Sequence, residues 1–264
     1  LRDPRWGRGH ETYGEDPFLT ARLGVAFIRG LQQRGEDGTL KTAACAKHFA
    51  AHSGPEGKRH SFNAEVSKKD LFETYLPAFE AAVKEGLVEA VMGAYNALNG
   101  SPCCCNADLL NGILRKKWGF HGHVVSDCGA IDDIHRGHRV TRSAKESAAL
   151  ALKNGCDLNC GKTYQHLIDS YEADLIDEND LDTALRRLLR ARFLLGMFDE
   201  PGSGPYDAIG DEVVACAEHK ALALRAAERA AVLLENNGIL PLDISKINKI
   251  AVIGPNADSR SVLL

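Results

Sequence analysis

An aspartate directly follows a short apolar segment at residues 123–129 (HVVSDCG). Two valines before a Ser-Asp-Cys-Gly turn are typical of a buried strand. A carboxylate at the C-terminal end of such a strand stands where α/β barrels place their catalytic groups. Asp127 could therefore act as a nucleophile on a sugar. The alternative is structural, because Asp is also a favoured N-cap of a following helix. From this stretch alone the structural interpretation is the stronger one.

Other polar side chains end apolar segments or lie in the loops between them. They are Arg8, Lys47, His48, Arg59 and Tyr95, with Arg5 in the same loop as Arg8 and His60 beside Arg59. Taken singly, each has a structural explanation as a salt bridge or a buried histidine. Taken with Asp127, they give one carboxylate among cations and hydroxyl groups. This set suits sugar binding, because each donor can pair with a sugar hydroxyl and the cations favour the ionised carboxylate.

Several other chemistries lack their sequence signatures. There is no HExxH motif, no evident Ser-His-Asp order and no phosphate-binding loop, so the segment IAVIGPN gives only a weak indication of a nucleotide site. Retaining glycosidases use two carboxyl groups about 5–5.5 Å apart. The sequence identifies no second carboxyl group to work with Asp127.

The pattern of elements predicts how these side chains are positioned. Apolar runs predict strands at residues 42–49, 89–95, 123–126, 156–159 and 249–255. Helical periodicity and capping signals predict helices at residues 18–33, 68–85, 108–117, 143–154, 164–173, 177–198 and 211–236. Strand, loop and helix repeat at least four times, which predicts an α/β fold with a parallel sheet. We expect the arginines of residues 177–198 to be solvated or salt-bridged.

We expect two domains joined by a linker. Residues 1–200 form a (β/α)8 TIM-type barrel that is incomplete at its N-terminus, since such a barrel needs about 250 residues. Residues 201–240 hold a Pro- and Gly-rich linker and an Ala-rich helix. Residues 241–264 carry the first strand of an α/β sandwich domain. The chain opens on Leu, so we expect the native N-terminus to lie upstream.

The composition of the chain limits the classes of binding partner that we expect. The chain has 264 residues, of which 44% are hydrophobic, and a formal net charge of −4, which gives no reason to expect nucleic acid or a membrane surface. The eight cysteines have no zinc-site spacing. We expect free thiols, which slightly favours a cytoplasmic location over a secreted or periplasmic one. A bridge from residues 103–105 to Cys128 or Cys160 is the alternative.

The motifs in combination resemble glycoside hydrolase family 3. They are DPRWGRGHETYGEDP, KHF, GPEGKRHSFNAEVS, VMGAYNALNG, WGFHGHVVSDCGA and NNGILPL followed by IAVIGPNAD, and together they run through essentially the whole chain. The resemblance implies a barrel followed by a sandwich domain. It also implies that Asp127 is the nucleophile, that Arg8, Lys47, His48, Arg59 and Tyr95 bind substrate, and that Met92 forms part of the pocket wall.

The resemblance places two functional groups outside the chain. The acid/base is expected to be a Glu beyond Leu264, and a sugar-binding Asp is expected before Leu1. Two positions depart from the family pattern. Cys128 stands where many members have Trp, and His60 lacks the Asp that orients a catalytic His in single-domain members, so we expect His60 not to serve as the acid.

These observations predict a retaining exo-β-glycosidase that needs no cofactor and no metal. The expected substrate is a terminal β-glucosyl residue of an oligosaccharide or aryl glycoside, with a β-xylosyl residue as the close alternative. A β-N-acetylhexosaminidase and a non-catalytic sugar-binding relative are further alternatives. We expect little activity from residues 1–264 alone. The sequence makes no prediction of the oligomeric state.

Overall fold

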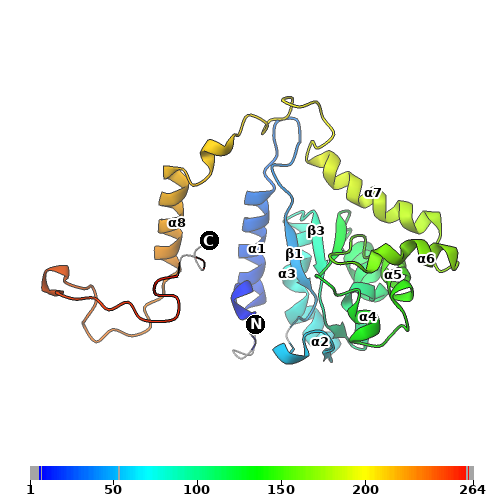
Figure 1. Cartoon of the computed structure of the whole chain (residues 1–264), viewed down its shortest axis with the longest axis horizontal. Coiled ribbons are helices and arrows are strands. Elements are labelled where there is room, and N and C mark those ends of the chain that lie inside the picture. The colour runs from blue at the N-terminus through cyan, green and yellow to red at the C-terminus, as the bar shows by residue number, and fades with distance from the viewer. Residues whose placement is uncertain (1–5, 7, 53, 260, 262–264) are drawn as a thin grey trace. The chain divides into compact units, whose positions relative to one another are not determined.

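The chain divides into two compact units in a computed structural model, Leu1–Ala208 and Ile209–Leu264 (Figure 1). The structure describes residues 6, 8–52, 54–259 and 261. Arg5, which we considered as a sugar-binding donor, lies outside the described residues. The first unit holds the sheet and every described residue of the predicted site.

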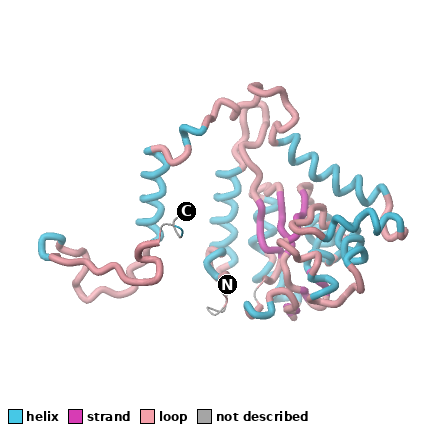
Figure 2. The backbone as a smooth tube through the Cα atoms, in the orientation of Figure 1, coloured by secondary structure: helices cyan, strands magenta, loops and turns pink. Residues whose placement is uncertain are grey.

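Three parallel strands form the central sheet of the first unit. They are β1 (Cys45–Phe49), β3 (Ala90–Gly93) and β6 (His123–Ser126), in the order β1-β3-β6 (Figure 2). Leu158 extends this order through a single parallel bridge to Val125, so the strand predicted at residues 156–159 is reduced to one bridge. The α/β class and the parallel sheet are therefore confirmed, while closure into a barrel stays a prediction.

A smaller sheet ties together the loops that leave the ends of β1 and β3. It consists of β2 (Asn63–Ala64), β4 (Ala97–Leu98) and β5 (Ser101–Pro102). β2 pairs in parallel with β4, and β4 pairs antiparallel with β5. This sheet fixes where the loops carrying the candidate site residues lie.

The first helix, α1 (Pro17–Leu31), packs through a different face from the most apolar one. Asp16 caps it by accepting hydrogen bonds from the first backbone N–H groups. The periodicity of residues 18–33 predicts an inward face of Leu19, Leu23, Phe27 and Leu31, but the first three are exposed and only Leu31 packs against the core. The helix instead buries Ala21, Val25 and Ile28, and the first two pack with Ala81 of α3 (Pro77–Lys84). Small side chains allow the two helices to approach closely, which explains the choice of face.

The helix predicted over residues 68–85 is divided into three parts. Ser67 caps it as expected, and α2 (Lys68–Asp70) passes into a π-helical turn at Leu71–Tyr75 before α3 (Pro77–Lys84). Pro77 has no N–H to donate to the preceding turn and its ring crowds that turn, so the regular helix is interrupted there. The proline then occupies the first turn of α3, where it is tolerated.

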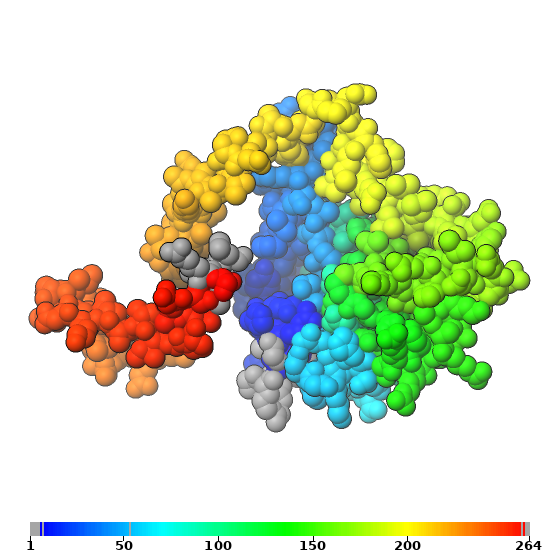
Figure 3. Space-filling view, viewed as in Figure 1, coloured from blue at the N-terminus to red at the C-terminus, as the bar shows by residue number. Residues whose placement is uncertain are grey.

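The remaining helices follow the prediction with changed bounds. They are a π-helical segment at Asp108–Lys117, α4 (Asp133–Arg136), α5 (Ala144–Lys153), a 3₁₀ turn at Thr163–His166 with α6 (Leu167–Glu172), α7 (Glu178–Leu194) and α8 (Ala217–Ala230). Short 3₁₀ turns lie at Gly9–Glu11, Glu56–Lys58, Cys103–Cys105, Asp211–Val213 and Ile244–Lys246. In the space-filling view, α7 and the segment with α5 and α6 form one continuous surface (Figure 3).

Two buried carboxylates, near the N-terminal ends of the strands, form ion pairs with arginines of α7. Asp157 accepts hydrogen bonds from Arg115 at 2.6 Å and from Arg187 at 2.7 Å. Glu89, just before β3, pairs with Arg190 at 2.6 Å. Two of the α7 arginines are therefore salt-bridged, as expected.

The second unit lacks the strand predicted at residues 249–255. That segment lies outside every helix and strand and is exposed. A strand needs a neighbour for its backbone N–H and C=O groups. Among the described residues of 209–264 there is no other strand to pair with it. α8 is also shorter than predicted, because it ends at Ala230.

The expectation that all cysteines are free thiols is corrected by the structure. Cys128 and Cys160 form a disulfide, with 4.5 Å between their Cα atoms, so the free-thiol prediction is wrong for this pair. The alternative of a bridge from residues 103–105 is also wrong, because all three of those thiols are free and buried. The two cysteines meet because Leu158 forms a parallel β-bridge with Val125 of β6. This pairing brings Cys160 next to the turn that follows Ser126. No helix among the described residues is long and apolar enough to cross a membrane.

Candidate active site

Asp127 lies immediately after β6, at the C-terminal end of the sheet. Its backbone N–H donates to Gly93 at 3.0 Å, and its side chain is only 10% exposed. Oδ1 accepts a hydrogen bond from the Cys128 N–H at 2.8 Å, whereas Oδ2 is buried with no hydrogen-bond partner among the described residues. One oxygen is thus held in place and the other is left available for chemistry. The helix-cap interpretation fails, because α4 begins only at Asp133.

Arg8 is the cation that joins the groups around Asp127. Its Nη1 lies 3.6 Å from Asp127 Oδ2 and 3.1 Å from His52 Nε2, and its Nη2 lies 2.8 Å from His48 Nε2. The opposite edge of the guanidinium forms a two-point contact with Glu11 at 2.6 and 3.0 Å. That bidentate pairing fixes the orientation of the guanidinium and therefore of the N–H groups that face His48, His52 and Asp127.

Glu11 is a second carboxylate of the site that the sequence analysis missed. It also accepts a hydrogen bond from Lys47 Nζ at 3.1 Å. The hydrogen bond from Arg8, with that from Lys47, lowers the pKa of Glu11 to about 2. Glu11 is consequently an anion at neutral pH and is unsuited to act as a general acid. The available signal was its spacing of three residues from Arg8 on the Gly9–Glu11 turn.

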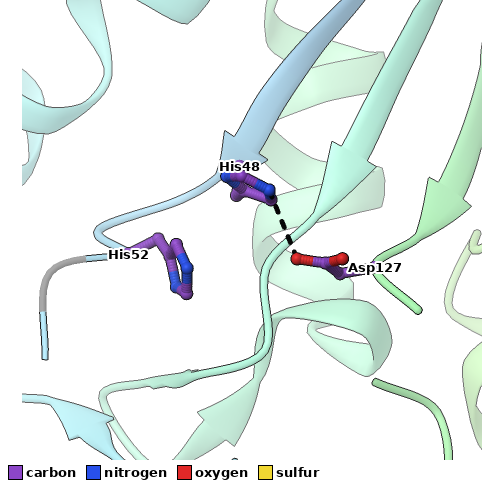
Figure 4. A group of neighbouring side chains, drawn as sticks. All are labelled: His48, His52 and Asp127. Atoms are coloured by element: carbon purple, nitrogen blue, oxygen red, sulfur yellow. Dashed lines mark ion pairs between the residues drawn. The ribbon is translucent and has the colours of Figure 1, made fainter. Parts of the chain in front are cut away.

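His48 and His52 are neutral hydrogen-bond acceptors toward Arg8. His48 is the last residue but one of β1 and lies close to Asp127, which follows β6, with 3.3 Å between Nε2 and Oδ2 (Figure 4). Burial lowers the pKa of His48 to about 3 and lowers the pKa of His52 as well. Because Nε2 of His52 faces Arg8, its Nδ1 carries the proton toward Asn96 Oδ1 at 3.2 Å. His52 and Asn96 were not predicted.

His48, His52 and Asp127 are close enough together to serve as ligands of one metal ion. Ligand atoms of His48, His52 and Asp127 lie within 4.8 Å of one another (Figure 4). However, the guanidinium of Arg8 contacts all three residues. The positive charge that these groups need is therefore supplied by a side chain, and a metal could bind only if Arg8 moved away.

Tyr95 supports the turn that carries Asp127. Its hydroxyl donates to the Cys128 carbonyl at 2.9 Å, and burial raises the pKa of Tyr95 to about 12, so the hydroxyl stays protonated. Arg59 lies over the Tyr95 ring, with 5.9 Å from its guanidinium carbon to the ring centroid, and also pairs with Glu56. Arg59 and Tyr95 thus form one wall beside Asp127.

His60 does have a carboxylate partner, which corrects the prediction that it lacks one. Its Nδ1 lies 2.7 Å from Asp133 Oδ2, and its ring packs edge-on against Tyr95 at 4.6 Å between centroids. Burial raises the pKa of Asp133. The partner comes from α4, 73 residues along the chain, so no local motif could have revealed it.

The site therefore gathers every described residue of the prediction except one. Arg8 and His48 lie beside Asp127, and Tyr95 connects to it through Cys128. Lys47 connects to it through Glu11 and Arg8, and Arg59 reaches it through Tyr95. Met92 is half-buried in β3 opposite Val125, and its place in a pocket wall stays a prediction.

A cavity of about 490 Å³ opens next to Lys47 and His48. Most of its wall is apolar, and α1 and α3 contribute Phe27, Ile28 and Phe79 to it. Asp127 does not line it. Asp127 therefore lies beside this cavity and not within it.

Comparison with known proteins identifies relatives of this chain. The family model for the glycosyl hydrolase family 3 N terminal domain matches residues 1–191. A xylan 1,4-beta-xylosidase from Xylanibacter ruminicola is 43% identical over 267 residues, which cover 100% of this chain and 31% of the relative. The chain thus spans about a third of the length of such relatives.

Solved structures show the same likeness. The exo-beta-xylosidase XlnD, in complex with a xylobiose aziridine probe, superimposes with a TM-score of 0.86 at 34% identity, covering 92% of this chain and 32% of that one. A beta-glucosidase from Listeria innocua, in complex with isofagomine, superimposes with a TM-score of 0.80 at 35% identity, covering 91% and 34%.

Proposed function

The chain belongs to glycosyl hydrolase family 3, and from this we propose that it forms the nucleophile-bearing part of a retaining exo-β-glycosidase. The observation that carries the proposal is the state of Asp127. One carboxylate oxygen is held by a backbone N–H, and the other is buried, has no hydrogen bond among the described residues, and lies 3.6 Å from the guanidinium of Arg8. A carboxylate oriented in this way suits attack on an anomeric carbon.

We propose that the reaction proceeds by double displacement. Oδ2 of Asp127 forms a bond to the anomeric carbon while the bond to the leaving oxygen breaks, and that oxygen takes a proton from an acid. Water then attacks the glycosyl ester, the same acid group removes its proton, and Asp127 leaves as a carboxylate. Arg8, Lys47 and His48 are the groups we assign to the sugar hydroxyls. The full (β/α)8 barrel that would enclose them belongs to the same proposal.

The acid is proposed to be a Glu beyond Leu264. Glu11 is excluded by its low pKa. His60 has an orienting carboxylate in Asp133, so it is the group to test against that Glu. If the Glu is the acid, His60→Gln keeps more than about a tenth of the activity, whereas loss of a true general acid costs about 10²–10⁴-fold.

For the substrate we place a terminal β-xylosyl residue first and a β-glucosyl residue second. The XlnD structure has the higher TM-score, and the relative from Xylanibacter ruminicola is a xylosidase. The β-glucosidase structure has nearly the same identity to this chain, which supports the second candidate. The disulfide at Cys128 favours an oxidising compartment, such as the periplasm or the cell exterior, over the cytoplasm.

The test uses the complete protein that carries this chain. We expect nitrophenyl β-xyloside to give a higher kcat/KM than nitrophenyl β-glucoside, and Asp127→Asn to lower both by about a thousandfold or more. Asp132→Asn is the matched control, since it removes a carboxylate five residues away that pairs with Arg136. A protein in which Asp127→Asn keeps a tenth of its activity is not the enzyme proposed.

A further inference from the structure

A second cavity lies at the opposite end of the sheet from Asp127. Its volume is about 530 Å³, and it is lined by Arg115, Phe120, His121, Arg186, Arg187 and Arg190. These residues belong to the Asp108–Lys117 segment, the loop that enters β6, and α7. β6 has four residues, so its first and last Cα atoms are about 10 Å apart. This arginine cavity is therefore separate from the proposed sugar site.

The arginine cavity has more positive than negative charge. Asp157 pairs with both Arg115 and Arg187, and Glu89 pairs with Arg190. Four guanidinium groups therefore face two carboxylates, which leaves an excess of two positive charges. Arg186 has no hydrogen-bond or ion-pair partner among the described residues. Both carboxylates are almost completely buried, at 1% and 6% exposure, so they lie behind the guanidiniums and not at the cavity mouth.

Arg115 shows that the positive charge is not fully compensated. Its Nη2 reaches Asp157 and its Nη1 donates to Gly122, but its Nε is buried without a hydrogen-bond partner. Burial, together with the charge of Arg187, lowers the pKa of Arg115 to about 10 despite the contact with Asp157. An additional negative charge in the cavity would relieve this repulsion.

We propose that the arginine cavity binds a small doubly charged oxyanion of the phosphate or sulfate class. Planar guanidinium groups present paired N–H donors that match the oxygens of such an anion. A dianion would neutralise the excess of two charges, whereas a monoanion would leave one. The bound anion would connect α7 to the loop that enters β6, without touching the groups around Asp127.

Inorganic phosphate is the probe, and isothermal titration calorimetry on the complete protein is the measurement. At constant ionic strength, with chloride as the reference anion, we expect saturable 1:1 binding in the micromolar to millimolar range. Sulfate is expected to compete with phosphate. Glucuronate, a carboxylate monoanion, is expected to bind at least tenfold more weakly. Tighter binding of glucuronate than of phosphate would overturn the assignment to a dianion.

Two matched variants of α7 test the location. Arg186→Gln removes the unpaired guanidinium of the cavity and is expected to weaken phosphate binding at least tenfold. Arg192→Gln removes another exposed charge of α7, which does not line the cavity, and a change of less than twofold in phosphate affinity is expected. Because both side chains are exposed, both variants should unfold at the wild-type temperature. Absence of saturable binding, or equal weakening by the two variants, would refute the proposal.

Discussion

Substitution of Asp157 by Asn tests whether the buried ion pairs hold the first unit together. Asn keeps the shape of the side chain and an oxygen that can accept from the Val124 N–H, which now donates to Asp157 at 2.8 Å. It removes the charge that faces Arg115 and Arg187. Breaking a buried ion pair by removing one partner costs about 3–5 kcal/mol, because the remaining charge is left uncompensated. For a unit of this size, that corresponds to a fall in unfolding temperature of about 6–20 °C.

The control is an ion pair of equal geometry in solvent. Arg22 and Glu85 form two contacts of 2.7 and 2.6 Å, but their side chains are 43% and 44% exposed. Such pairs contribute about 0–1 kcal/mol, so Glu85→Gln should lower the unfolding temperature by less than about 4 °C. Thermal unfolding followed by circular dichroism compares the two variants in one buffer.

The double variant Asp157→Asn with Arg187→Met separates charge from packing. Removing one of the two stranded guanidiniums should recover part of the stability lost in Asp157→Asn, since the repulsion between Arg115 and Arg187 disappears. Our reasoning is refuted if Asp157→Asn unfolds within about 2 °C of Glu85→Gln. It is also refuted if the double variant is less stable than the sum of its two single changes.

Three further predictions concern the site. His48 has a pKa of about 3 in the folded protein against 6.5 for an ordinary histidine. Its neutral form therefore contributes fully to the free energy of unfolding above pH 6.5, and this contribution is lost as the pH falls toward 3. Between pH 7 and 5 the loss is about 2 kcal/mol, and denaturant unfolding of His48→Asn should show a correspondingly shallower pH dependence. Tyr95→Phe removes the hydrogen bond to the Cys128 carbonyl; at about 1 kcal/mol this lowers kcat about fivefold, and an unchanged kcat would contradict the supporting role. Opening the Cys128–Cys160 disulfide frees a loop with a sequence separation of 32 residues; Cys160→Ser should cost about 3–4 kcal/mol, and reductant should lower the wild-type unfolding temperature to that of the variant.

Local signals in the sequence predicted most of the sheet and its helices. The apolar runs ending at Lys47-His48, Tyr95 and Asp127 correspond to β1, β3 and β6. Ser67 caps a helix as predicted, and the helix predicted from residue 143 begins there, with Ser143 as its cap. These features depend on neighbours within a few residues, which is why pattern and propensity sufficed.

The features that were missed depend on residues far apart in the chain. His60 meets Asp133, and Cys128 meets Cys160, only because separate loops converge at the C-terminal end of the sheet. The strand predicted at residues 249–255 had a suitable pattern, but a strand also requires a neighbour, which the sequence pattern does not report. Glu11 lay within reach of local reasoning, since it is three residues from Arg8.

The most direct test of the central claim is to trap the covalent intermediate. The complete protein is incubated with a 2-deoxy-2-fluoro β-xyloside that carries a good leaving group, then digested with trypsin, and the labelled peptide is sequenced by mass spectrometry. Trypsin cleaves after Lys117 and Arg136, so one peptide carries Asp127 together with Asp132 and Asp133. We predict that fragmentation places the fluoroxylosyl group on Asp127. A label on Asp132, Asp133 or any other residue, or turnover that proceeds without any covalent adduct, would contradict the account.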